Sequence, residues 1–123
     1  MKTYDPQIYP RKLYILDSLE ELELFEGREG GTLEIPSDKS VDASVWPCLR
    51  KDNNTYCIVA YFHGATIQNI AHEATHIANT IFQDCQVDFD YHHDEHYAYF
   101  VGWIAKCIAE ALNVKLIKTR RNE

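Results

Sequence analysis

The fold of this chain is constrained most by segment 56–62, which reads Tyr-Cys-Ile-Val-Ala-Tyr-Phe and carries no charged side chain. Its β-branched and aromatic residues predict a strand, and a strand that is apolar on both sides must be covered on both faces. The helix predicted over 66–82 repeats its apolar residues with a period near 3.6, so it also has one face to bury. Together the two segments predict helices packed on a sheet.

The rest of the pattern adds a hairpin and two further helices. The polar turn 51–55 separates two strands, and its asparagines tolerate the backbone of a tight turn. Ser18 and Glu21 have the spacing of a capping box at the start of a short helix, and glycines from Gly27 onward should end it. Thr66 is the expected N-cap of the next helix. The predicted elements are strands at 11–16, 32–35, 45–50 and 56–62 and helices at 17–26, 66–82 and 94–112.

Composition narrows the class of protein. The chain has 123 residues, so we expect residues 1–123 to form a single domain. A net charge of −7 repels phosphate backbones, which argues against a nucleic-acid partner. We find no membrane span and no secretory signal, and we expect a cytoplasmic protein. The four cysteines form no C-x-x-C pair and are expected to be buried thiols, although Cys48 and Cys57 could face each other across the hairpin.

The chemistry is carried by segment 72–76, which is an H-E-x-x-H motif on a predicted helix. His72 and His76 are four residues apart, so both imidazoles lie on one helix face and can reach one metal ion. Glu73 is the next residue along the helix, so it is rotated away from the position of a direct metal ligand. Its carboxylate can instead hold a water molecule on the metal and take the proton of that water. The motif therefore predicts a zinc ion (Zn²⁺) with Glu73 as the general base.

A catalytic zinc ion needs a third protein ligand, and Glu95 is our prediction. It opens the helix predicted over 94–112, and two antiparallel helices joined by a loop of this length would bring it to the motif. Several other side chains near Glu95 could take the same place. These alternatives are His92, His93, His96, Asp88 and Asp90.

His72-Glu73-x-x-His76, followed by Glu95 after residues 77–94, resembles the gluzincins, the thermolysin-like zinc metallopeptidases. The stretch from Asp94 to Gly102 also resembles small H-E-x-x-H proteins of phages and prophages. The resemblance covers at most residues 56–112. It implies a zincin-like α+β fold, in which a small antiparallel or mixed sheet packs on two long helices that carry the metal site.

The chain departs from the gluzincin pattern at Tyr99, where many members have an aspartate that bonds a ligand histidine. An attacked amide also needs a donor to its oxyanion. We expect His92, His93 or Tyr99 to serve, with Tyr91 and Tyr97 as further candidates. Strand 56–62 is expected at the edge of the cleft, where a substrate peptide could add as a further strand.

Three functions fit these residues. The first is a zinc-dependent metallopeptidase that cleaves a peptide or protein substrate. The second is a non-catalytic, phage-associated interaction module, in which zinc braces the two long helices. The third is a zinc hydrolase of a non-peptide amide, which would use the same residues.

Overall fold

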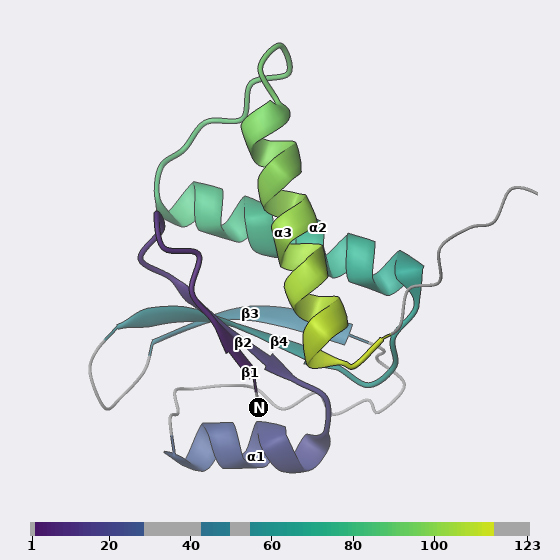
Figure 1. The fold of residues 1–123 in the computed structure, drawn as a ribbon. Helices are drawn as coiled ribbons and strands as arrows, with labels where there is room; N and C mark the ends of the chain where they lie inside the picture. Colours follow the sequence, from purple (N-terminus) through teal and green to yellow (C-terminus); the bar gives the residue numbers. More distant parts are fainter. Residues whose placement is uncertain (1, 29–42, 50–54, 115–123) are drawn as a thin grey trace, which may run out of the picture.

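A four-stranded mixed sheet with helices on both faces organises the chain (Figure 1). The structure is a computed structural model, and it describes residues 2–28, 43–49 and 55–114. The architecture is α+β, as predicted, and the two long helices pack together. In chain order the elements are β1 (Lys2–Tyr4), β2 (Lys12–Leu16), α1 (Leu19–Arg28), β3 (Ala43–Leu49), β4 (Tyr56–Phe62), α2 (Ile67–Asp84) and α3 (Glu95–Ala111).

Strand β4 lies inside the sheet, in the order β1-β2-β4-β3. It pairs in parallel with β2 and antiparallel with β3, so the predicted hairpin is confirmed, with Leu49 opposite Tyr56. The expectation that strand 56–62 borders the cleft was wrong, because β4 has a neighbour on each side. The outer strand on this side of the sheet is β3.

The two faces of β4 are buried in two separate cores, as its apolar sequence predicts. Ile58, Ala60 and Phe62 pack with α2 and α3. Cys57, Val59 and Tyr61 point the other way and pack with Leu22 and Phe25 of α1. The sheet is therefore the middle layer, with α1 on one face and the two long helices on the other (Figure 1).

Helix α2 begins at the predicted cap. The Thr66 hydroxyl accepts a hydrogen bond from the Asn69 N–H at 3.1 Å, and the Asn69 side chain accepts one from the Thr66 N–H at 2.8 Å. This reciprocal pair satisfies two backbone donors that the first turn of a helix leaves unpaired. The cap thus fixes where α2 begins and the rotation at which it presents its faces.

Helix α1 starts with a variant of the predicted cap. The Ser18 hydroxyl accepts from the Glu21 N–H at 3.1 Å, but the Glu21 carboxylate accepts from the Asp17 N–H at 3.0 Å, one residue before the expected donor. The helix ends at Arg28, two residues later than predicted. A single glycine at Gly27 weakens a helix without having to end it.

The remaining differences concern short segments. Strand β1 was not predicted, because three residues, of which two are exposed and Tyr4 is half-buried, are too few to show a periodic signal. The strand expected at 32–35 lies outside the described residues. Cys48 and Cys57 do face each other in the β3–β4 register, and the cysteines are thiols. None of the described helices is long and apolar enough to cross a membrane.

The core around α2 can be tested with two isoleucines of that helix. Ile77 is fully buried, whereas Ile67 is 75% exposed. We expect Ile77→Ala to lower the free energy of unfolding by about 2–5 kcal/mol, because it leaves a cavity in the core. Ile67→Ala is the matched control and should change it by no more than about 0.5 kcal/mol. Urea denaturation measures both, and equal losses would contradict this placement of α2.

Candidate metal centre

The two motif histidines converge on α2. Their Nε2 atoms are 3.1 Å apart, and the ring centroids are separated by 4.6 Å. Two histidine nitrogens that bind one zinc ion at about 2.0–2.1 Å in tetrahedral geometry lie about 3.3 Å apart. The rings of His72 and His76 are therefore close to the arrangement that a shared ion requires.

Glu73 completes the group from the sheet side of the helix. It is 6% exposed and is the only charged residue that is buried in the described part of the chain. Its carboxylate makes no hydrogen bond or ion pair with any described residue. A carboxylate that is shielded from water is stabilised by a nearby cation, so this position fits a metal ion.

These three side chains satisfy the distance requirement for a metal site. Within the described residues, His72, Glu73 and His76 form the one group of at least three His, Cys, Asp or Glu side chains whose ligand atoms lie within 4.8 Å of one another. Two imidazole nitrogens suit a divalent transition metal, and the nearby carboxylate can contact an ion or a water molecule bound to it. The group can therefore hold a metal ion.

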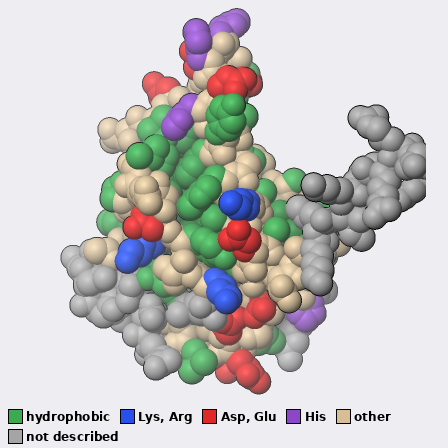
Figure 2. All heavy atoms as spheres, viewed as in Figure 1, with side chains coloured by type: hydrophobic (Ala, Val, Ile, Leu, Met, Phe, Trp, Pro, Cys, Tyr) green, Lys and Arg blue, Asp and Glu red, His purple; other side chains and the backbone are tan. Residues whose placement is uncertain are grey.

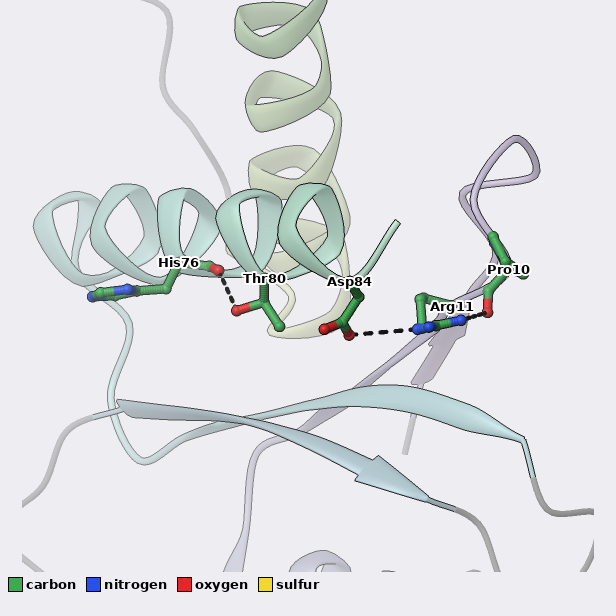
Figure 3. Close-up of polar contacts among 5 residues, drawn as sticks. All are labelled: Pro10, Arg11, His76, Thr80 and Asp84. Carbon is green, nitrogen blue, oxygen red and sulfur yellow. Dashed lines mark hydrogen bonds and ion pairs between the residues drawn. The ribbon is translucent and has the colours of Figure 1, made fainter. Parts of the chain in front are cut away.

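The group opens into a cleft of about 520 Å³ between α2 and the outer strand β3. Residues 43–46 of β3 form one wall, and Asn69 and Thr80 extend the other wall beyond the motif. His76 and Thr80 lie on the side of α2 that faces the sheet, with the His76 ring extending along the helix (Figure 3). A ligand in this cleft would lie against both the motif and the outer strand.

An ion pair anchors the far end of α2. Asp84, in the last turn of the helix, faces Arg11 with 3.5 Å between Oδ2 and Nε (Figure 3). Arg11 also donates to the carbonyl of Pro10 at 2.8 Å and lies over the ring of Tyr56, 5.1 Å from its centroid. These contacts tie the C-terminal end of α2 to the segment just before β2.

Glu95 begins α3, as predicted, but it does not belong to the metal group. Helix α3 crosses α2 instead of running antiparallel beside it, and its first turn projects beyond α2 (Figure 1). The intervening residues carry the chain away from the end of α2 before α3 starts. The role of Glu95 as a third ligand stays a prediction.

The other predicted residues also lie outside the lining of the cleft. His92 and His93 are exposed and bond to Asp90, through the His92 N–H at 2.9 Å and the His93 Nδ1 at 3.0 Å. These two bonds lower the pKa of the Asp90 carboxyl. Tyr99 is 75% exposed on α3. That His92, His93 or Tyr99 donates a hydrogen bond to an oxyanion stays a prediction.

Of the remaining candidates, His96 contacts the N-terminal segment, with its Nε2 atom 2.6 Å from the Tyr9 hydroxyl. Asp88 and Asp90 lie in the segment between the long helices, and neither belongs to the metal group.

Sequence reasoning missed the walls of the cleft. Thr80 follows His76 by one helical turn, so the spacing alone could have placed it on the motif face. Its hydroxyl donates to the His76 carbonyl at 2.8 Å and so contacts the backbone, not the ring. Residues 43–46 are distant from the motif in sequence, and nothing in their pattern indicates the cleft.

No family model matches the chain, and no curated protein or solved structure matches it. What supports a site is the local arrangement itself, which is an H-E-x-x-H spacing whose three side chains converge on one helix beside a cleft.

Metal binding can be tested with single histidine variants. We expect His72→Ala and His76→Ala each to weaken Zn²⁺ binding by at least about 100-fold, because each removes a direct ligand and even outer-shell changes cost 10–100-fold. His63→Ala is the matched control, since His63 does not belong to the group and has no proposed role at the metal. Isothermal titration of the metal-stripped protein measures the affinities. Equal weakening in all three variants would exclude this site.

Proposed function

We propose that this protein is a zinc-dependent metallopeptidase with a zincin-like arrangement of sheet and helices. The observation that carries the proposal is Glu73, a buried carboxylate with no partner among the described residues, beside two converging imidazoles. The cleft next to it gives a substrate access to the same side of α2. The resemblance of the motif to gluzincins supports the same chemistry.

In this proposal His72 and His76 hold the zinc ion through their Nε2 atoms. When bound, zinc supplies a Lewis acid that polarises a carbonyl and allows water to attack at neutral pH. Glu73 lies one residue from His72 and is shielded from solvent, so its carboxylate can accept the proton of the attacking water. It can then return that proton to the leaving amine.

Two parts of the proposal rest on sequence alone. Glu95 is proposed as the third ligand from the resemblance, since it lies outside the group of three. His92, His93 and Tyr99 are proposed as donors to the oxyanion because they flank Glu95 in sequence. Single substitutions of these four residues would distinguish the two roles, because loss of a ligand weakens metal binding whereas loss of an oxyanion donor lowers the rate of cleavage.

Strand β3 is the proposed platform for a peptide substrate. It is the outer strand of the sheet, and residues 43–46 line the cleft with the motif. An extended peptide can add to such a strand through main-chain hydrogen bonds. Pro47 has no N–H to donate, so pairing is favoured over the residues before it, which are the ones beside the motif.

A non-catalytic module, in which a metal braces the two long helices, is less well supported than a metallopeptidase. All three converging side chains come from α2, so the group does not link the two helices. A structural zinc site also needs four protein ligands. Hydrolysis of a non-peptide amide would use the same residues, and substrate profiling distinguishes it.

The mechanism can be tested with Glu73→Gln, which keeps the shape of the side chain but removes the base. We expect this variant to bind Zn²⁺ and to lose at least about 100-fold in kcat/KM, because general-base catalysis contributes about 10²–10⁴-fold. Cleavage of a peptide library is measured by mass spectrometry, and metal content by elemental analysis.

Glu110→Gln, which removes an exposed carboxylate on α3, is the matched control and should cleave like the unmodified protein. A chelator should abolish cleavage, and added Zn²⁺ should restore it. A Glu73→Gln protein that cleaves at the full rate would rule out the proposed role of this residue.

A further inference from the structure

The charges of this protein are unevenly distributed. All 12 lysines and arginines lie outside residues 52–105, the stretch that contains β4, α2 and most of α3. Arg11, which reaches α2 from just before β2, is already paired with Asp84. In Figure 2 the projecting end of the molecule, where α3 begins, shows acidic, histidine and hydrophobic side chains but no lysine or arginine.

Carboxylates and exposed rings alternate at this projecting end. We call this set the loop surface, and it consists of Asp88, Phe89, Asp90, Tyr91, Asp94 and Glu95. Phe89 is 44% exposed and Tyr91 is 85% exposed. Arginine and lysine side chains bind well to such a surface, because their cations pair with carboxylates and also lie favourably over aromatic rings.

The rings of the loop surface are held in place. Phe89 packs edge-on against Tyr91 and Tyr97, with centroid distances of 5.0 Å and 4.8 Å. The Tyr97 hydroxyl donates to the Asn79 side chain at 2.6 Å, which ties this cluster to α2. These contacts restrict the motion of the rings before any partner arrives, and this lowers the entropy cost of binding.

A second cavity lies beside the loop surface. It measures about 480 Å³ and lies between α2 and the loop, with Asn79, Asp88 and Phe89 in its lining. The cleft of the metal centre borders α2 as well, and the two hollows share no lining residue. In that cleft Glu73, which has no partner among the described residues, adds a further carboxylate that is 6% exposed.

Three of the four carboxylates of the loop surface lack an ion-pair partner among the described residues, and the fourth, Asp90, pairs with His93. Asp88, Asp94 and Glu95 form no ion pair with any residue that the structure describes. Asp90 accepts hydrogen bonds from His92 and His93, which lower its pKa and keep it ionised. An anionic ligand would be repelled here, whereas a cationic one would supply the missing partners.

We propose that the loop surface and the adjoining cavity bind a lysine- or arginine-rich segment of another polypeptide and direct it toward the metal centre. The docking step depends only on the charges and rings described above. Delivery to the metal centre rests on the proposed function. The substrate class would then be basic polypeptides.

The docking step can be tested without metal or catalysis. The probe is a fluorescein-labelled peptide in which arginine and lysine alternate with glycine and serine, and its anisotropy is followed on adding the full, metal-stripped chain. We expect binding that weakens as ionic strength rises from about 0.01 M to about 0.15 M, where the screening length falls from about 30 Å to about 8 Å. The same peptide with glutamate at each basic position should not bind.

The double variant Asp88→Asn, Asp94→Asn should raise the Kd of the basic peptide about three- to tenfold, as expected for two exposed charge pairs. Asp94 makes no capping hydrogen bond through its side chain, so this change removes no cap from α3. Tyr91→Ala should weaken binding by about twofold. The matched control is Glu20→Gln, Glu23→Gln, which changes the net charge equally from exposed positions on α1 and should leave the Kd unchanged.

Equal weakening by both double variants would overturn the proposal, since it would show attraction to net charge alone. Binding of a divalent cation to the loop carboxylates, without any binding of the basic peptide, would also overturn it. If the peptide does not bind but Zn²⁺ does, this inference fails while the proposed function stands. If the peptide binds and Zn²⁺ does not, the docking surface stands and the proposed function fails.

Discussion

The structure depends on the burial of β4 on both faces. Its residues alternate between two cores, and each core needs its own helical cover. Helix α1 supplies one cover, while α2 and α3 together supply the other. Because α2 must bury Ile77 and Ile81 against the sheet, the remaining faces of this helix are fixed in direction, and His72 and His76 are placed beside the outer strand. The position of the metal centre is therefore a consequence of core packing.

Glu73 shows how this packing produces a chemical site. Its position on α2 turns the carboxylate toward the sheet, where it is shielded from water and meets no partner among the described residues. Such a group is costly for stability and useful for catalysis, because a shielded carboxylate interacts more strongly with a nearby cation or proton. The cleft beside it borders α2, and the acidic loop surface lies in the segment that follows this helix. The proposed metal centre and the proposed docking surface for a basic polypeptide can thus lie in the same small domain.

Local patterns predicted much of this fold. The cap at Thr66, the hairpin of β3 and β4 and both long helices follow from short-range rules, since each depends on neighbours in the sequence. The convergence of His72 and His76 belongs to the same class, because helical spacing alone places the two rings together. Relations between distant segments were harder to predict. The assignment of strand 56–62 to the cleft edge failed because strand order depends on which strands pair, and one of these partners, β2, lies far away in the chain.

Local patterns in the sequence were enough to predict a sheet that is buried on both faces and a helix with two imidazoles and a carboxylate within reach of one ion. Both properties arise from periodicities of two and 3.6 residues in the order of side chains. Tertiary packing, in contrast, set the burial of Glu73 away from any described partner, the position of β3 in the wall of the cleft and the crossing of α3 over α2, which leaves Glu95 outside the group. These outcomes depend on how complete elements pack against one another, and packing is settled by the shape and volume of the whole core, beyond any local pattern.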